Sequence, residues 1–242
     1  MNRTTPFTAS ALSLLTALSL TACGGDKQPD NSTGEPRPST HRADKVPPAE
    51  RLAELVVTPA EVDGFSVKEP TSEFVFAESP EEVTVDKPDC APLAYAMNQL
   101  PLGDPQADLT RTLAEKAKGY GSAYTYITLA AYVADGAESS MADVKQAVKS
   151  CGDGFTASAG GGTSTYESVT AEELAPAGDE ALGFKSTMTF RGTPHILHTE
   201  VVRSGDVLGV YVSVNGMAIA NAEPSDAKLP PTVVKAQNAK LG

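Results

Sequence analysis

The chain has 242 residues, contains no Trp, and carries 31 acidic against 19 basic side chains, which gives a formal net charge of −12 at pH 7. This excess of negative charge repels nucleic acid phosphates and anionic lipid headgroups, so it argues against both as partners. Residues 49–242 are enough for a single domain with a buried core, and the scarcity of aromatic residues predicts that this core is mainly aliphatic.

The N-terminus has the pattern of a lipoprotein signal peptide over residues 1–22. Arg3 supplies a positive charge, and residues 7–20 are small or apolar. That run is long enough for a secretory signal and too short for a permanent membrane span. It leads into a sequence that resembles the bacterial lipobox, Leu20-Thr21-Ala22-Cys23. We therefore expect cleavage before Cys23 and lipidation of its thiol, including palmitate. An ordinary signal peptide that happens to precede a Cys is the alternative.

Residues 23–48 form the next predicted segment, a lipidated Cys followed by a tether. The tether is polar and rich in Pro and Gly, so it cannot bury enough apolar surface to offset its ordering entropy. A disordered segment of this length reaches roughly 25–30 Å. Two or three acyl chains on Cys23 anchor a protein stably. The sequence thus predicts a domain held on the outer face of the cytoplasmic membrane.

Hydrophobic periodicity predicts helices and strands in the rest of the chain. Helices are expected over residues 49–57, 90–100, 139–150 and 232–241. Strands are expected over residues 65–67, 73–77, 122–133, 163–174, 182–190, 196–203 and 207–214, of which 163–174 would be an edge strand. Residues 101–121 fit either a short helix or a mobile flap. This order predicts an α+β fold, with an antiparallel sheet and helices packed on one face.

Two cysteines remain after the predicted cleavage, Cys90 and Cys151. In an exported protein an even pair indicates a disulfide, and each Cys lies at the end of a predicted helix. A redox or metal site is the alternative. It lacks a CxxC pair and a neighbouring His, so a disulfide is favoured and no metal is expected.

The strand over residues 122–133 would present three tyrosines on one face, Tyr124, Tyr126 and Tyr132. Tyr offers flat apolar area and a hydroxyl, which suits sugars, peptides or lipid headgroups, but these rings could equally pack beneath a helix. Arg191 and Arg203 lie near the ends of the predicted meander. They could bind an anionic ligand, with solvated hairpin ends as the alternative.

Catalytic and cofactor motifs are not found. The sequence contains no GxSxG, HExxH or phosphate-binding loop, and we expect no cofactor. Of the three histidines, His41 lies in the tether, whereas His195 and His198 are three apart in a predicted strand. They would face opposite sides, which does not suit a shared metal, and we expect them to be solvated or at an edge. The sequence therefore predicts a non-enzymatic protein.

Three segments resemble a known family: Asp89-Cys90-Ala91-Pro92-Leu93, the strand from Tyr124 into the helix that ends at Cys151, and residues 201–208. They are similar to actinobacterial lipoproteins whose domain looks like the extracellular sensor domain of mycobacterial receptor kinases of the PknH type. The resemblance implies a disulfide-stabilised domain with a polar cleft for an unidentified ligand. This chain differs in having one disulfide pair and no kinase segment.

The resulting expectation is a membrane-anchored, extracytoplasmic domain that binds or senses a small molecule, a glycan or a lipid. Two other functions stay open. A carrier of lipid or glycolipid across the envelope would need a large apolar cavity. A scaffold for envelope proteins would present a flat apolar patch to a protein partner.

Overall fold

The computed structural model describes residues 46–71, 75–117 and 123–242. The predicted leader, the lipidation site Cys23 and nearly all of the tether lie outside these residues. The expected α+β class, the antiparallel sheet and the disulfide are confirmed. Among the described residues, no helix has the length and apolar character needed to cross a membrane.

Ten strands of the described residues form one sheet in the order β1-β3-β4-β9-β8-β7-β6-β5-β2. All neighbours along this path are antiparallel, and β10 pairs with β8 in parallel. The bounds are β1 (Phe65–Lys68), β2 (Thr84–Val85), β3 (Ala107–Glu115), β4 (Tyr124–Ala131), β5 (Phe155–Ala159), β6 (Gly162–Glu172), β7 (Glu180–Phe190), β8 (Thr193–Ser204), β9 (Val207–Val214) and β10 (Ser225–Ala227).

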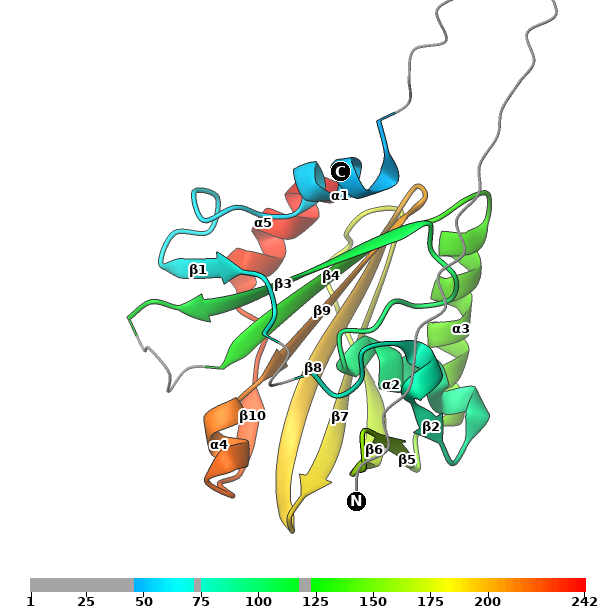
Figure 1. Cartoon of the computed structure of the whole chain (residues 1–242), viewed down its shortest axis with the longest axis vertical. Coiled ribbons are helices and arrows are strands. Elements are labelled where there is room, and N and C mark those ends of the chain that lie inside the picture. Colours follow the sequence, from blue (N-terminus) through cyan, green and yellow to red (C-terminus); the bar gives the residue numbers. More distant parts are fainter. Residues whose placement is uncertain (1–45, 72–74, 118–122) are drawn as a thin grey trace, which may run out of the picture. The chain divides into compact units, whose positions relative to one another are not determined.

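Helices lie on both faces of the sheet (Figure 1). Their bounds are α1 (Pro48–Leu55), α2 (Ala91–Met97), α3 (Gly136–Ser150), α4 (Gly216–Ala220) and α5 (Pro231–Leu241), with short 3-10 turns η2 (Pro80–Glu82) and η3 (Pro88–Cys90). α2 and α3 pack together on one face, as the sequence predicts, and α1 and α5 add a layer over part of the other. The second layer was not anticipated.

The face under α2 and α3 carries the larger apolar core, and we call it face A. On α3, Met141, Val144 and Val148 repeat at helical spacing and point into this core. The disulfide Cys90–Cys151 joins the start of α2 to the end of α3, and both cysteines are buried. The disulfide therefore holds the start of α2 next to the end of α3.

The opposite face, face B, is covered in part by α1 and α5. Leu52 of α1 and Val233 of α5 belong to one apolar cluster with Ile127 and Leu129 of β4. Gln237 of α5 is fully buried and joins the two helical segments: its amide oxygen accepts from the Val57 amide at 3.0 Å, and its amide nitrogen donates to the Leu55 carbonyl at 2.9 Å.

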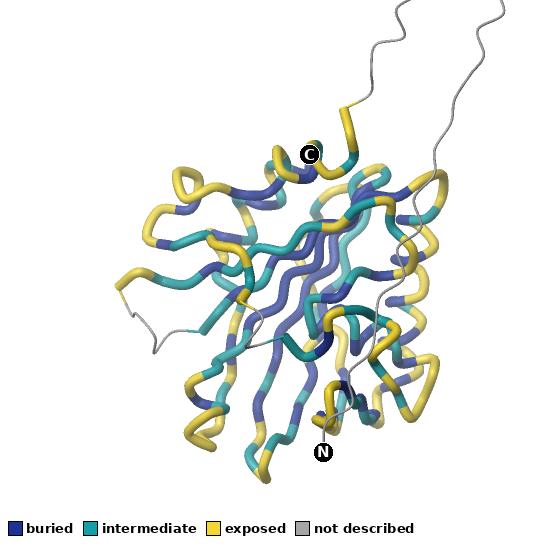
Figure 2. Tube along the Cα trace, viewed as in Figure 1, coloured by how far each residue is buried: buried dark blue, intermediate teal, exposed yellow. Residues whose placement is uncertain are grey.

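The central strands are buried on both sides, as Figure 2 shows by their colour. In β8, Val201 belongs to the core of face A and Val202 to that of face B. In β9, Leu208 and Tyr211 divide in the same way. This two-sided burial explains why β8 and β9 are rich in Val and Leu at consecutive positions.

Three local expectations need correction. Residues 101–121 contain neither helix nor flap at their centre, because residues 107–115 form β3. Residues 163–174 are not at the edge, since β6 lies between β7 and β5. In addition, the sequence did not predict β5. Its buried positions are Phe155, Ala157 and Ala159, and small residues give too weak a hydrophobic alternation to reveal a strand. Part of the strand expected over 73–77 lies outside the described residues, and residues 75–77 form no strand.

Candidate functional site

The three candidate tyrosines divide into a half-exposed pair in β4 and a buried ring, Tyr132, directly after the strand. Tyr124 and Tyr126 lie two residues apart on face A, and both are partly accessible. Burial, together with the neighbouring Tyr124 ring, raises the pKa of Tyr126 above its usual value. This pair could contact a ligand on face A. Its binding role remains a prediction.

Tyr132 is a structural residue of the core rather than a ligand contact. It is 3 % exposed, packs among the residues of face A, and donates its hydroxyl to the Leu102 carbonyl at 2.5 Å. Burial raises the pKa of this phenol well above its usual value. The alternative that a ring in this stripe packs beneath helices therefore holds for Tyr132.

The two candidate arginines lie at opposite ends of β8 and do not form one site. Arg191 is in the turn between β7 and β8, exposed, with its guanidinium 5.2 Å from the centre of the Phe190 ring. Arg203 is near the other end of the strand, where it pairs with Asp179 at 3.2 Å. Each arginine therefore has a local partner, and an anion bridging the two is excluded by their placement.

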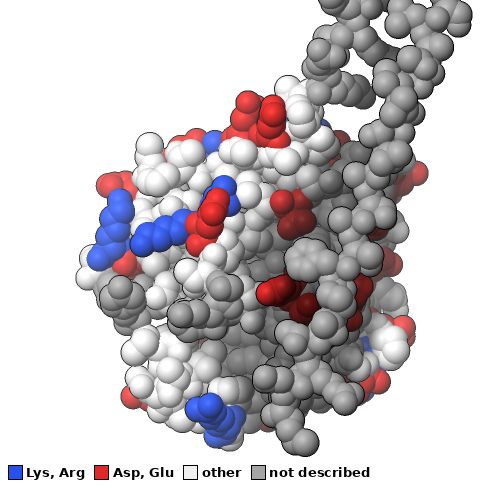
Figure 3. Space-filling view, in the orientation of Figure 1, with Lys and Arg blue, Asp and Glu red and all other residues white. Residues whose placement is uncertain are grey.

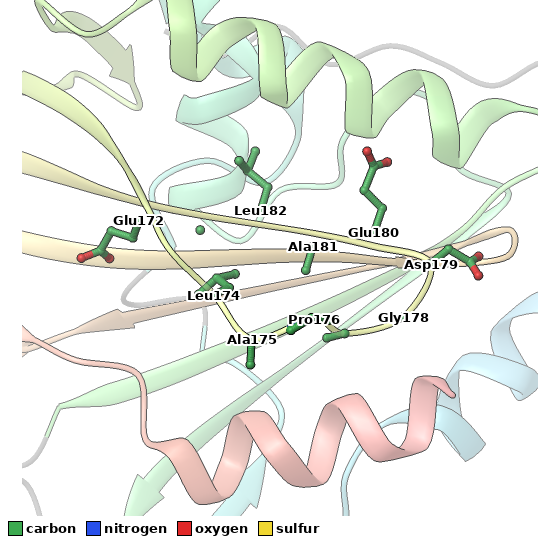
Figure 4. A pocket seen from close by; sticks show the side chains of 11 residues that line it. Glu172, Leu174, Ala175, Pro176, Gly178, Asp179, Glu180, Ala181 and Leu182 are labelled. Carbon is green, nitrogen blue, oxygen red and sulfur yellow. The ribbon is translucent and has the colours of Figure 1, made fainter.

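The described surface includes two hollows that border the sheet. The smaller, about 350 Å³, is bounded by the connection between β6 and β7. Figure 4 shows Glu180 and Leu182 pointing toward α3, while Leu174, Ala175 and Pro176 lie on the other side of the strand. Glu180 forms an ion pair with Lys145 of α3, so its negative charge already has a partner within the protein.

The larger hollow, about 700 Å³, lies where β1, β3, β4 and β9 meet the segment after β10. Its described lining residues are Gly64, Phe65, Glu115, Ala117, Ala123, Asn215 and residues 226–232. The volume is within the range of small-molecule sites, roughly 300–1,000 Å³. Its wall combines apolar groups with the charged side chains Asp226 and Lys228, which suits a ligand of mixed polarity.

A cluster of polar side chains connects the two hollows. His198 of β8 is 6 % exposed, and each of its ring nitrogens faces a carboxylate: Nδ1 lies 2.6 Å from Glu172 and Nε2 lies 2.6 Å from Asp226. Glu172 borders the smaller hollow and Asp226 the larger. The Lys228 ammonium lies 3.2 Å from both Nε2 and Asp226. We call these four residues the His198 cluster.

The contacts within the His198 cluster shift the pKa of the Asp226 carboxyl. Its partial burial acts to raise its pKa, but the hydrogen bonds from His198 and Lys228 outweigh that effect and lower the pKa below its usual value. Asp226 is therefore held as a carboxylate, whose oxygens accept from the imidazole and the ammonium.

A second buried acid lies further along β8. Glu200 is 5 % exposed and accepts a hydrogen bond from the Asn238 amide of α5 at 3.1 Å. Asn238 in turn accepts from the Tyr211 hydroxyl at 2.8 Å. Burial raises the pKa of Glu200 above its usual value, although the Asn238 bond acts to lower it. Desolvation therefore raises the pKa of Glu200 by more than the hydrogen bond from Asn238 lowers it.

Replacing Glu200 by Gln is expected to flatten the pH dependence of stability. Because the folded chain holds the Glu200 proton more tightly than the unfolded chain, the contribution of this group is greatest below the ordinary carboxyl pKa. It is lost as the pH rises toward the folded-state pKa. Gln keeps an acceptor for Asn238 and does not titrate. Denaturant unfolding from about pH 4 to about pH 7 should show E200Q gaining on the wild type; a constant difference would contradict this.

Sequence reasoning did not anticipate the His198 cluster. His195 and His198 do lie on opposite faces, but both are buried rather than solvated. His195 bonds only the Ser225 hydroxyl, at 2.9 Å. Glu172, for which the sequence suggested no role, lies within hydrogen-bond distance of His198. In the described part of the chain, no group of three or more His, Cys, Asp or Glu side chains could hold a metal ion.

The surface charge is mixed on the face that Figure 3 shows. Lys and Arg side chains gather mainly toward β1 and β3 and at the lower end, with Asp and Glu among them and over the remaining described surface. The described part of this face therefore offers no continuous basic patch, in keeping with the low content of basic residues.

The fold is shared with a known extracellular domain. A solved structure of the extracellular domain of PknH from Mycobacterium tuberculosis matches with a TM-score of 0.51 and 14 % identity, over 79 % of this chain and 93 % of that chain. The resemblance inferred from the sequence is thus confirmed at the level of the fold. No protein-family model matches the sequence, and no curated protein is significantly similar to it.

Proposed function

We propose that the chain is a lipid-anchored, extracytoplasmic protein whose domain binds a small ligand, without catalysis, in the larger hollow. The single observation that carries the proposal is this hollow of about 700 Å³, with apolar and charged groups in one wall. The fold similarity to an extracellular domain supports placement outside the cytoplasm. The lipobox ending at Cys23 supports the anchor.

The composition of the wall favours a polar small molecule over a lipid. Phe65, Leu229 and the two prolines supply apolar contact, whereas Asp226 and Lys228 supply opposite charges at one side. A lipid carrier needs a cavity lined almost wholly by apolar groups, because unpaired charges against acyl chains are costly. A sugar or a zwitterionic metabolite matches this wall better.

Filling the hollow is expected to abolish ligand binding without unfolding the protein. Ala117 is exposed and lines the hollow, so Ala117→Trp places a large ring there at little cost to the core. Native mass spectrometry of the full chain, extracted from its own membrane, should show a co-purifying small molecule on the wild type. The same measurement on Ala117→Trp should show the protein without it.

Ala175→Trp is the matched control, because Ala175 is also exposed and lines the smaller hollow. It should keep the bound molecule. If both variants or neither lose it, the larger hollow is not the binding site. The intact mass also tests the anchor: the chain should begin at Cys23 with diacylglycerol and fatty acid attached, and an unacylated N-terminus would refute that part of the proposal.

A further inference from the structure

His198 bridges two separate parts of the sheet. Its Nδ1 side contacts Glu172 at the end of β6, and its Nε2 side contacts Asp226 in the middle of β10. β10 has three residues and pairs only with β8 among the described strands. A short strand of this kind has few backbone hydrogen bonds, so a side-chain bond contributes a large share of its attachment.

The two carboxylates set a requirement on the imidazole. Carboxylate oxygens only accept hydrogen bonds, so both contacts are hydrogen bonds only when both ring nitrogens carry a hydrogen. A neutral imidazole has one N–H and one lone pair. If it keeps the N–H toward Glu172, its Nε2 lone pair faces the Asp226 carboxylate, and that contact becomes repulsive.

A replacement donor for Nε2 is already in place. The Lys228 Nζ lies 3.2 Å from Nε2 and 3.2 Å from Asp226. Lys228 can therefore donate to a neutral Nε2, while Asp226 moves from the imidazole to the ammonium alone. Both Asp226 and Lys228 line the larger hollow, so this exchange of partners changes the wall of the site.

Apart from the His198 cluster itself, no charged side chain near His198 offers Nε2 another hydrogen-bond acceptor. The titratable side chains that face it from the elements packed against it, and along its own strand, are Glu172 of β6, Lys185 of β7, Glu200 of β8, and Asp226 and Lys228 of the β10 segment. Lys185 is exposed, and Glu200 is bonded to Asn238. The proton on Nε2 therefore decides between Asp226 and Lys228.

We propose that His198 is a pH-sensitive switch of the larger hollow: at low pH its imidazolium holds Asp226 and β10 against the sheet, and at higher pH loss of the proton transfers Asp226 to Lys228 and loosens β10. This inference rests on the proposed function, because it assigns regulation to the same hollow. Imidazole is the side-chain group that can gain or lose a proton without leaving the physiological pH range, which is why the switch is assigned to this residue.

Hydrogen exchange of β10 tests the switch directly and needs no ligand. Protection factors, corrected for intrinsic exchange, are measured for Ser225–Ala227 in the full wild-type chain at about pH 5 and about pH 8. They should fall at least about tenfold as the pH rises, which is the effect of losing one charge-assisted hydrogen bond. In His198→Gln the protection should be the same at both pH values.

His195→Gln is the matched control, because His195 is also buried in β8 and contacts β10 through the neutral Ser225 hydroxyl. It should retain the pH dependence. A second measurement, ¹⁵N NMR of the wild-type His198 ring, should show both nitrogens protonated at the lower pH and a midpoint that matches the exchange data.

Unchanged protection in the wild type while the ring titrates would overturn the proposal, and so would a dependence that survives in His198→Gln. These readouts are independent of the Ala117→Trp result. A switch without a ligand refutes the proposed function alone, and a ligand without a switch refutes only this inference.

Discussion

Replacement of both Cys90 and Cys151 by Ala is expected to lower the free energy of unfolding by about 4 kcal/mol. The two cysteines are 61 positions apart, so the disulfide removes the entropy of a long loop from the unfolded chain. The loop contains α2, β3, β4 and α3, so it includes both helices of face A and two strands of the sheet. For a domain of this size, the melting temperature should fall by roughly 10 °C.

Thermal and denaturant unfolding of the wild type and the double Ala variant measure this effect. Reduction of the wild type provides the control, since it breaks the same bond without changing the residues. The reduced wild type and the variant should agree within about 1–2 kcal/mol, a range set by the small cavity that each Ala leaves. A loss below about 1 kcal/mol in both would mean that the unfolded chain is not restrained by the bridge.

Tyr132→Ala is expected to cost about 3–5 kcal/mol, as for other large buried rings. The ring is enclosed by face A, and its removal also leaves the Leu102 carbonyl without its donor. Tyr132→Phe keeps the ring and loses only the hydroxyl, so its cost should be about 1 kcal/mol. Equilibrium unfolding in denaturant measures both variants.

The matched pair is Tyr124→Ala with Tyr126→Ala, because these rings lie in the same strand and are partly accessible. Each should cost clearly less than Tyr132→Ala. Neither ring lines the larger hollow, so the double variant should keep a ligand bound there with little change in melting temperature, and loss of the ligand would instead place the binding site on face A. A stability loss as large as that of Tyr132→Ala, with ligand binding intact, would make the pair part of the core instead.

The fold could be predicted from the sequence wherever hydrophobic periodicity is strong. The apolar stripe of α3 predicted that helix, and the alternation in β7 predicted that strand. The paired cysteines predicted a disulfide between the ends of two helices. All three predictions are confirmed. The prediction failed at β5, where Ala157 and Ala159 carry the buried face. Small residues bury well but contrast little with their neighbours, so a period of two is invisible there.

The polar cluster could not be predicted for a different reason. Glu172, His198 and Asp226 are far apart in the sequence and meet because β10 pairs with β8 in parallel. A strand of three residues, two of them polar, has no periodicity to identify it. Short-range patterns do identify opposite faces for His195 and His198, but not what each faces, because that depends on the register between distant strands.

The amide of Gln237 has a consequence for how the chain completes its fold. It satisfies Val57 and Leu55, which lie 180 and 182 positions earlier in the sequence. Until the final helix has docked, those two backbone groups lack this partner, and the first helix of the domain cannot settle into its buried environment. A chain that leaves its ribosome N-terminus first must therefore wait until residue 237 has emerged before α1 can complete its packing. Removal of residues 237–242 would withdraw the glutamine and loosen α1, which lies some 180 positions earlier in the sequence.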